Sequence, residues 1–396
     1  MTIKKFPAFG IALLLICFLL VFNGCRSKTE TSSESAEKSS RSKYYADQVD
    51  IKHAKGFTID YFDHYKVVKI ISPFEKTADT TKYLLLERGA TKPSGYSKSQ
   101  VIEIPIRSIV AMSSMHVGLL GFLESYDKLT GLGNLQYVYA PEVIKLIQNG
   151  KVEEVGRDQG LNEEKLVNMH PDLVMTMGSP GGGIGHYKIL ETAGIPVMIN
   201  SEWVETSPLA RAEWVKLLAA LLNKEELVNK KFLTLENEYS RLSLLAATAK
   251  VKPKIISGLN TKDTWFLPSG DSYMAQFFRD AAADYPWSDQ KAAGSLSLNF
   301  EAVYPLALTA DCWLNVGFDS KDTKKDILAM DSRYSDFKAF KSGQLFSYNN
   351  RVNEKGSNDF FESGNVNPQI VLADLIKILH PELLPNHQLV YYKKLE

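Results

Sequence analysis

Two hydrophobic patterns alternate along most of the chain. Short apolar runs that are typical of buried strands occur, for example, at residues 172–177 and 195–199. Segments with helical spacing of apolar residues lie among them, as at residues 141–148 and 163–169. Strands and helices that alternate with short connections predict parallel sheets covered by helices. The expected fold class is therefore α/β.

The middle of the chain, residues 207–249, has a helical pattern only. Ser207-Pro208 is a typical helix start, because serine can cap the first turn and proline fits the first helical position. Helical residues then continue to the end of the segment without further Gly or Pro, apart from a hesitation at Asn223. Taken as one helix, residues 224–249 would be roughly 39 Å long at about 1.5 Å per residue. The pattern therefore predicts a connecting helical segment that crosses a whole domain.

This segment separates an N-terminal α/β lobe at residues 101–206 from a C-terminal α/β lobe at residues 250–396. No Gly/Ser-rich linker joins them, so we expect the connection to be a single, long, rigid helix. Residues 44–100 differ from both lobes, because short strand-like runs separated by turn residues occupy them. We expect a small strand-rich extension of the N-terminal lobe there, with strands at residues 56–62, 66–71 and 82–87.

The N-terminus carries the pattern of an export signal. A pair of lysines precedes an unbroken apolar run at residues 11–22, which is shorter than the about 20 residues that span a bilayer. The run ends at Asn23-Gly24-Cys25, which resembles a bacterial lipobox with Cys25 as the lipidated residue. The alternative is a plain signal peptide with an incidental cysteine. We expect residues 1–24 to be removed and residues 25–43, rich in serine and charge, to form a flexible tether.

Composition and charge narrow the class of protein. The chain of 396 residues has 46 Lys and Arg against 46 Asp and Glu, so it lacks the basic surplus of nucleic-acid binders. A charged fraction of 23% with 11% aromatic residues excludes wholesale disorder. If Cys25 carries lipid, the mature chain keeps Cys312 as its lone thiol. A disulfide within one chain is then excluded.

The two lobes contain related sequences. Residues 162–175 combine an acidic helix start, a short helix, a Pro-Asp pair and an apolar strand, and residues 299–314 repeat this order with a slightly longer gap. Two similar α/β lobes joined by one long helix resemble the helical-backbone class of ABC-importer substrate-binding proteins. The resemblance covers roughly residues 104–384 and rests on Arg107-Ser-Ile-Val, His170-Pro-Asp-Leu-Val, Ser207-Pro-Leu-Ala-Arg-Ala-Glu-Trp, Pro268-Ser-Gly-Asp-Ser-Tyr and Asn367-Pro-Gln-Ile-Val-Leu-Ala-Asp-Leu.

This resemblance implies a function and a place in the cell. Proteins of the class have two Rossmann-like lobes and deliver ferric siderophores, cobalamin or haem to an ABC permease and its ATPase. The resemblance implies a non-enzymatic, monomeric receptor, lipid-anchored in the cell envelope and facing the periplasm. Its ligand would be a small metal complex, and no cofactor of its own is expected. An iron siderophore or a cobalamin-type complex is favoured over haem, because no Tyr or His stands out as an axial ligand.

Two other functions remain as alternatives, an extracytoplasmic hydrolase and a binding lipoprotein that has no permease. Ser113, Ser114 and His116 lie close in sequence, but the Gly-x-Ser-x-Gly motif of hydrolases is absent. The histidines form no His-x-x-x-His or Cys/His cluster, so no dedicated metal site is expected. The Gly-rich run at residues 178–185 lacks the Gly-Lys-Ser/Thr of a phosphate-binding loop, and we interpret it as a flexible cleft loop.

In the family that this chain resembles, one glutamate on each lobe pairs with arginines of the permease. By motif position these glutamates are Glu164 and Glu301, although Glu163 leaves the register open by one residue. Two carboxylates on opposite lobes would orient and steer a basic partner. The alternative is a structural role, because an acidic residue in the first turn of a helix is favoured by about 0.3–1 kcal/mol.

The ligand site is expected in a cleft between the lobes, because ligands of open α/β sheets bind outside the C-terminal ends of the strands. The loops that follow the predicted strands are rich in Trp, Tyr and Phe, whose large faces and polar edges suit a flat, bulky, partly polar ligand. The alternative for each ring is a role in capping the core. His116 could ligate a metal within the ligand or cap the helix that begins there. The predicted ligand-binding residues are Ser114, His116, Tyr139, Trp265, Tyr285, Trp287, Arg351 and Phe360.

Overall fold

The computed structural model describes residues 43–71, 80–157, 160–178, 187–292, 294–317 and 319–396. These residues belong to one compact unit, Ser40–Glu396. The predicted signal peptide, the lipidation site Cys25, almost all of the tether and most of the Gly-rich run therefore lie outside the described residues. In the described part of the chain, no helix is both long and apolar enough to cross a membrane.

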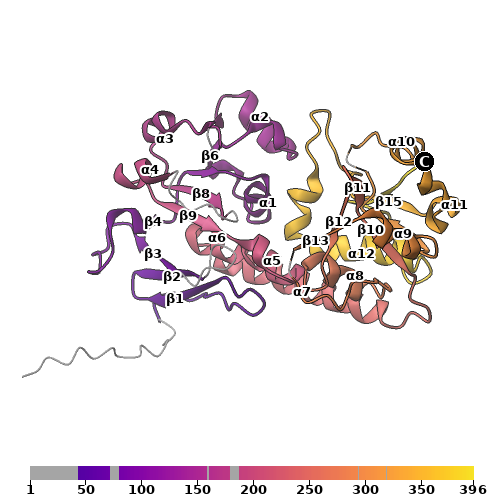
Figure 1. Cartoon of the computed structure of the whole chain (residues 1–396). Helices are drawn as coiled ribbons and strands as arrows, with labels where there is room; N and C mark the ends of the chain where they lie inside the picture. The colour runs from indigo at the N-terminus through magenta and orange to yellow at the C-terminus, as the bar shows by residue number, and fades with distance from the viewer. Residues whose placement is uncertain (1–42, 72–79, 158–159, 179–186, 293, 318) are drawn as a thin grey trace, which may run out of the picture. The chain divides into compact units, whose positions relative to one another are not determined.

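The N-terminal lobe is built around a parallel sheet of five strands in the order β7-β6-β5-β8-β9, covered by helices (Figure 1). The strands are β5 (Ile109–Ala111), β6 (Leu129–Leu132), β7 (Glu153–Glu154), β8 (Leu173–Met177) and β9 (Val197–Asn200). The helices are α1 (Ser114–Phe122), α2 (Pro141–Gln148), α3 (Glu163–Met169) and α4 (Lys188–Thr192). Pro141 at the first position of α2 and the Asn162 cap of α3 explain why both helices begin where the sequence predicts.

The C-terminal lobe contains two sheets. Its main sheet has the order β10-β14-β15-β16, in which the first three strands are parallel and the last is antiparallel. A separate antiparallel sheet of β11, β12 and β13, which the sequence pattern does not predict, lies in the same lobe. The strands are β10 (Ile255–Ser257), β11 (Leu259–Thr261), β12 (Thr264–Pro268), β13 (Ser295–Leu298), β14 (Cys312–Leu314), β15 (Leu345–Ser347) and β16 (Lys393–Lys394). The helices are α8 (Tyr273–Asp280), α9 (Phe300–Ala307), α10 (Lys324–Met330), α11 (Lys338–Ser342) and α12 (Pro368–Leu379).

Short 3-10 helices punctuate the loops of both lobes. They are η1 (Lys98–Gln100), η2 (Tyr126–Lys128), η3 (Leu135–Tyr137), η6 (Glu202–Val204), η7 (Ser332–Asp336), η8 (Asp359–Phe361) and η9 (Gly364–Val366). Three of them, η3, η6 and η8, contribute residues to the cavities between the lobes.

The connecting segment is three helices and not one, which corrects the prediction of a single helix. They are α5 (Pro208–Glu213), α6 (Val215–Leu222) and α7 (Glu225–Ala246). Asn223 ends α6 because its backbone is left-handed, with φ of 52°. Helix α7 has 22 residues and is therefore about 33 Å long. Its first half packs Val228, Phe232 and Leu235 into the core of the N-terminal lobe, and its second half packs Tyr239, Leu242 and Ala246 into the core of the C-terminal lobe.

The strand-rich extension is a four-stranded sheet of order β1-β2-β3-β4. The strands are β1 (Phe57–Phe62), β2 (Tyr65–Ile71), β3 (Thr80–Glu87) and β4 (Val101–Ile104). The first three are antiparallel, while β4 pairs in parallel with β3 and carries the sheet beyond the predicted boundary at residue 100. The segment before β1 approaches α5 and α6 so closely that a Cβ at Gly56 would lie 2.6 Å from the Trp214 ring.

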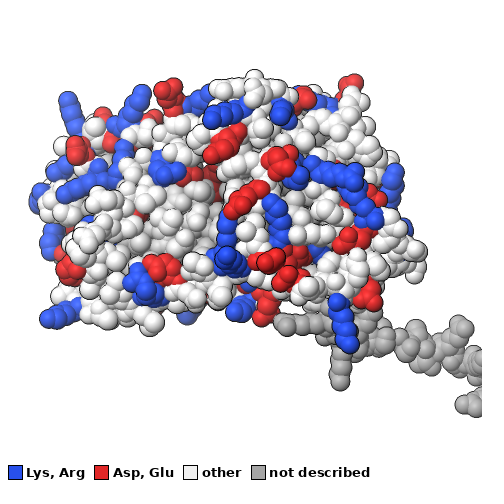
Figure 2. Space-filling model, turned by 180° about the vertical axis from the view of Figure 1, so that it is seen from behind, with Lys and Arg blue, Asp and Glu red and all other residues white. Residues whose placement is uncertain are grey.

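Charges of both signs are interspersed on the face seen in Figure 2. Lys and Arg side chains alternate there with Asp and Glu side chains, and no broad field of one sign covers this face. This arrangement agrees with the even total of 46 basic and 46 acidic residues. The face therefore lacks the basic stripe that a nucleic-acid backbone requires.

Candidate functional site

Two neighbouring cavities of about 590 Å³ each lie where the two lobes face each other. They share the side chains of Tyr348 and Phe361, whose rings meet edge to face with centroids 5.5 Å apart. We call the first cavity the polar compartment and the second the aromatic compartment. Each has the size of a small-molecule site, and together they form a cleft that could hold a bulky ligand.

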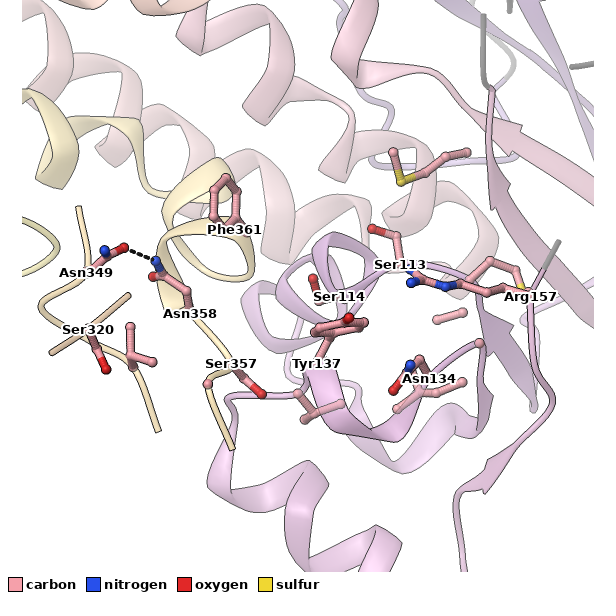
Figure 3. Close-up of a pocket in the computed structure, with 18 of the residues that line it drawn as sticks. Ser113, Ser114, Asn134, Tyr137, Arg157, Ser320, Asn349, Ser357, Asn358 and Phe361 are labelled. Atoms are coloured by element: carbon pink, nitrogen blue, oxygen red, sulfur yellow. Dashed lines mark hydrogen bonds between the residues drawn. The ribbon is translucent and has the colours of Figure 1, made fainter. Parts of the chain in front are cut away.

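The N-terminal lobe supplies one wall of the polar compartment from loops at the C-terminal ends of its parallel strands. Ser113 and Ser114 follow β5, and Asn134 and Tyr137 follow β6. Arg157 lies over the ring of Tyr137, with the guanidinium carbon 5.3 Å from the ring centroid. Figure 3 shows these side chains gathered on one side of the cavity. They offer hydroxyl, amide and guanidinium groups to a ligand.

The C-terminal lobe supplies the opposite wall from the loops after β14 and β15. The Asn358 Nδ2 donates to Asn349 Oδ1 at 2.9 Å, and the Asn349 Nδ2 donates to the Asp319 carbonyl at 3.2 Å. Ser320 and Ser357 complete this polar wall, which Figure 3 shows facing the N-terminal lobe. The hydrogen bonds fix both amides in place, so this wall is preorganised for a polar ligand.

Rings and aliphatic side chains dominate the aromatic compartment. Phe266 and Phe361 line it with side chains that are large, apolar and about half exposed, at 52% and 47%. Trp203 also lines it, and the buried indole Nε1 has no hydrogen-bond partner among the described residues. A buried donor without a partner is costly, so an acceptor on a ligand would be stabilised there. Tyr273 and Tyr348 add two more aromatic walls.

A loop of the C-terminal lobe, residues 353–362, crosses to the N-terminal lobe beside the polar compartment. We call it the bridging loop. Its Glu362 carboxylate accepts hydrogen bonds from the backbone N–H groups of Tyr139 at 2.7 Å and Ala140 at 3.0 Å, just before α2. The Asn353 Nδ2 donates to the Val138 carbonyl at 2.9 Å, and the Ser357 hydroxyl donates to the Gln136 carbonyl. The bridging loop therefore fixes the separation of the two walls.

Burial raises the pKa of Glu362 to about 7, against the opposing effect of the two backbone donors. A carboxyl group with a raised pKa in the folded state contributes stability below its unfolded pKa, near 4.5 here, and loses that contribution as the pH rises through about 7. The shift corresponds to about 3 kcal/mol at most. Glu202, which is buried beneath Arg211, has a pKa raised to about 7 by burial and contributes in the same direction.

We predict that Glu362→Gln flattens the pH dependence of stability, because the substituted side chain no longer ionises. The measurement is the free energy of unfolding in urea at about pH 5 and about pH 8. Its decrease between these two pH values should be about 1–3 kcal/mol smaller in the variant than in the native protein. Comparing the two slopes cancels the contribution of Glu202. The exposed Glu382, which is not among the groups that shift the pKa of Glu362, provides a matched control, since Glu382→Gln should keep the native slope. Equal slopes for native protein and Glu362→Gln would contradict the assignment.

Four of the predicted ligand residues lie on or beside the cleft. Ser114 lines the polar compartment and Phe360 lines the aromatic compartment. Arg351 lies next to the cavity wall, where its Nε donates to Asp359 Oδ2 at 2.6 Å and its guanidinium lies 5.2 Å from the centroid of the Tyr139 ring. Tyr139 and Arg351 thus bridge the lobes beside the site and form no part of either cavity lining.

The other four predicted residues lie inside the protein. Trp265 is fully buried and stacks on Trp313 in the core of the C-terminal lobe, with centroids 5.7 Å apart. Tyr285 and Trp287 belong to the same core. His116 has no exposed surface, and burial lowers the pKa of its imidazole to about 3. These side chains offer nothing to a ligand in the cleft, so we leave them out of the candidate site.

Several residues of the cleft were not among the predicted ones. Phe266 could have been recognised, because Trp265 and Leu267 alternate with it along β12 and take the buried side of the strand. Phe361 follows the buried Phe360 in a similar way. Arg157 follows β7, a strand of 2 residues that the sequence pattern did not predict, and neither spacing nor composition singles it out. Its role emerges from its position over Tyr137 alone.

Glu164 and Glu301 occupy equivalent positions in the two lobes. Each is the second residue of a helix whose first turn is capped by asparagine, Asn162 in α3 and Asn299 in α9. Both glutamates are exposed, whereas Glu163 is partly buried. Glu164, and not Glu163, is therefore the residue equivalent in position to Glu301. The Glu301 carboxylate lies 3.6 Å from the Arg333 guanidinium, and its side chain is 73% exposed. Both carboxylates are thus available to a partner.

The described residues contain no group of three or more His, Cys, Asp or Glu side chains that could hold a metal ion. Cys312 is buried among core residues, and burial raises the pKa of its thiol well above the ordinary value. The hydrogen-bond donors among the described lining residues are hydroxyl, amide and indole groups with a single guanidinium, and the lining carboxylates of Asp271, Asp319 and Glu205 belong to no such metal-binding group. Such donors suit recognition of a preformed complex better than ligation of a bare ion.

Comparisons with known proteins agree with the predicted class. The model of the periplasmic binding protein family matches residues 121–352, which is more than half of the chain. An uncharacterized lipoprotein of Methanocaldococcus jannaschii is 25% identical over 99% of this chain and 96% of its own length. A possible iron-binding (periplasmic solute-binding) protein of Staphylococcus epidermidis has a TM-score of 0.53 at 15% identity, covering 70% of this chain and 99% of its own. The periplasmic vitamin B12 binding protein of Vibrio cholerae has a TM-score of 0.50 at 12% identity, covering 72% and 99%.

The family match runs from the last residues of α1 to the residue before the bridging loop, and it includes α2 to α11 and β6 to β15, and so most of the cleft. It leaves out the sheet β1–β4 and the closing helix α12. The two structural likenesses, at low identity, extend the agreement to the fold of both lobes. The family inferred from the sequence motifs is thereby confirmed: the chain belongs to the periplasmic binding protein family.

Proposed function

We propose that this protein is the lipid-anchored receptor of an ABC importer, which captures an iron-siderophore or cobalamin-type complex in the cleft and delivers it to a membrane permease. The observation that carries the proposal is the cleft itself. Its walls come from different lobes, its size suits a bulky ligand, and its lining combines fixed polar groups with exposed rings. A metal complex with an organic periphery has both kinds of surface.

The comparisons support this class of ligand and of attachment. The possible iron-binding protein and the vitamin B12 binding protein share the fold of this chain. The archaeal relative that spans the whole length of the chain is named a lipoprotein, which supports Cys25 as the anchor. The exposed and equivalent carboxylates of Glu164 and Glu301 give the permease one contact on each lobe.

Tryptophan fluorescence tests ligand capture directly. Of the five tryptophans, Trp214, Trp265 and Trp313 are fully buried, whereas Trp203 lines the aromatic compartment. We expect titration with cyanocobalamin or a ferric siderophore to quench the emission with a dissociation constant below about 10 µM, worth roughly −7 kcal/mol. Trp203→Phe should lose most of the quenching that saturating ligand produces, while Trp287→Phe, which alters a ring of the core, should keep it.

The same titration separates the proposal from its alternatives. Binding of hemin alone would assign the cleft to haem. Turnover of any bound compound would favour a hydrolase. If cyanocobalamin, hemin and a range of ferric siderophores all fail to bind below about 10 µM, the proposed function is wrong.

A further inference from the structure

Charged side chains are sparse in the cleft, and most of them are acidic. Among the described residues that line either compartment, Arg157 is the one cation, whereas Asp271, Asp319 and Glu205 are anions. Glu205 is buried and accepts from the backbone N–H groups of Lys55 and Gly56, so its charge is fixed behind the wall. The described lining residues therefore carry a net negative charge, from a buried Glu205, a partly buried Asp271 and an exposed Asp319.

This distribution matters for the overall charge of the ligand. Sites for carboxylates, phosphates and other anions use several guanidinium or ammonium groups, because each negative charge needs a partner once water is removed. Arg157 lines the polar compartment over Tyr137, while Asp319 stands on the opposite wall, where its carboxylate accepts from the Lys321 backbone N–H at 2.8 Å. A ligand with several negative charges would meet one cation and lose hydration near two exposed or partly exposed aspartates.

The neutral hydrogen-bond donors and acceptors of the cleft also bear on the charge of the ligand. Serine hydroxyls and asparagine amides supply most of the polar groups in the polar compartment, and the Asn358–Asn349 bond holds two of them rigid. Such groups pair well with amides, hydroxyls and carbonyls of an uncharged ligand. In the aromatic compartment the unpartnered Trp203 Nε1 requires one acceptor beside a flat or apolar surface.

We infer that the cleft selects metal complexes that are uncharged or carry a positive charge and have an amide- and hydroxyl-rich periphery. The cleft rejects complexes that carry several negative charges, such as ferric tris-catecholates. This inference rests on the proposed function, because it narrows the ligand of the same site. Asp271 and Asp319 are its specificity-determining residues, one in each compartment.

The test compares two ferric complexes of similar size and different charge on the full mature protein. A neutral ferric trihydroxamate should bind at least about tenfold more tightly than a ferric tris-catecholate with three negative charges. The affinity for the tris-catecholate should rise as salt is increased from about 0.03 M to about 0.3 M, because screening weakens the repulsion by the aspartates. This measurement on the native protein needs no variant.

A double variant then assigns the effect to the two carboxylates. Asp271→Asn combined with Asp319→Asn should lower the ratio of trihydroxamate to tris-catecholate affinity by about tenfold. Asp263→Asn is the matched control, since Asp263 is an exposed aspartate of the same lobe at the β11–β12 turn and should leave the ratio unchanged.

The possible outcomes separate the two proposals. If the native protein binds the tris-catecholate as tightly as the trihydroxamate, or more weakly at high salt, the charge selection is overturned and the proposed function stands. If the native protein binds neither of these complexes nor cyanocobalamin, the proposed function falls and the inference falls with it. An unchanged affinity ratio in a folded double variant would remove Asp271 and Asp319 as its cause.

Discussion

Replacing Glu164 and Glu301 together with arginine is expected to abolish uptake of the ligand by the proposed importer and to leave capture of the ligand unchanged. The two carboxylates lie outside both cavities, on the second residue of equivalent helices in the two lobes. If they meet arginines of the permease, the substitution places like charges in contact and removes both pairs. Truncating charge pairs at an interface typically costs about 2–5 kcal/mol each, and juxtaposed like charges add several more.

The matched control is Glu226→Arg. Glu226 is also an exposed glutamate at the second position of a helix, but it lies at the start of α7, between the lobes along the chain. The substitution has the same change in charge and the same small effect on the helix terminus. Uptake should therefore remain near the native rate in Glu226→Arg and vanish in the double variant.

Uptake of a radiolabelled ferric complex by cells that carry the permease and the ATPase provides the measurement, with fluorescence titration to verify capture. Each single variant should fall between the native protein and the double variant, because one lobe retains its contact. Native uptake by the double variant would refute the docking role, and the favourable position of an acidic residue in the first helical turn would then suffice to explain both glutamates.

The sequence predicted the elements whose signals are local. Helices α2 and α3 have the predicted bounds because Pro141 and Asn162 mark their starts in the sequence itself. The long helix α7 was expected for the same reason, since apolar spacing and the absence of Gly and Pro are visible residue by residue. The expectation that it runs unbroken through residue 224 to residue 249 was too long by a few residues at its end, because α7 stops at Ala246.

Features that depend on tertiary contact were not predictable in this way. In the sheet β11–β12–β13, β11 and β12 form a hairpin, but β13 pairs with β12 from a position remote in sequence, as in the pairing of Trp265 with Leu298. The prediction that the Trp265 ring lies in the cleft was wrong, since this ring is buried in the core. That a residue is aromatic does not indicate which face of β12 is covered by the core. The bridging loop depends on the Glu362 carboxylate reaching the other lobe, and no pattern within residues 353–362 indicates that contact.

The sheet β1–β4 lies outside the family match, and buried charges attach the segment that precedes it to the connecting helices. Glu213 in α5 accepts hydrogen bonds from the backbone N–H groups of three consecutive residues: Lys52 at 3.0 Å, His53 at 2.6 Å and Ala54 at 2.8 Å. The Lys216 ammonium donates to the same carboxylate at 2.7 Å. The extension is therefore integrated with the helices that join the lobes, and its detachment should destabilise them.

We predict that Glu213→Ala has the largest effect on stability of any single substitution considered for this protein. The side chain is fully buried, so its removal leaves three backbone donors and the Lys216 ammonium without their acceptor. Breaking a buried ion pair from one side costs about 3–5 kcal/mol. The free energy of unfolding in urea should fall by that amount, and proteases should cut the segment at residues 50–56 faster than in the native protein.

Glu236→Ala is the control that makes this result specific. Glu236 in α7 contacts the same segment through a hydrogen bond with the His53 imidazole at 2.7 Å and an ion pair with Lys52 at 3.7 Å, but its side chain is partly exposed at 19%. Exposed or partly exposed pairs contribute about 0–1 kcal/mol, so this variant should unfold close to the native midpoint. A loss below about 1 kcal/mol in Glu213→Ala, no larger than in Glu236→Ala, would mean that packing of Trp214 and Gly56 holds the extension without the carboxylate.

The pH dependence of the native protein's stability provides an independent check. Burial opposes ionisation of Glu213, but Lys216 and the backbone donors keep its pKa below the ordinary 4.5. The stability it provides is present above that pH and is lost as the pH falls through the lowered pKa, opposite in sign to the effect of Glu362.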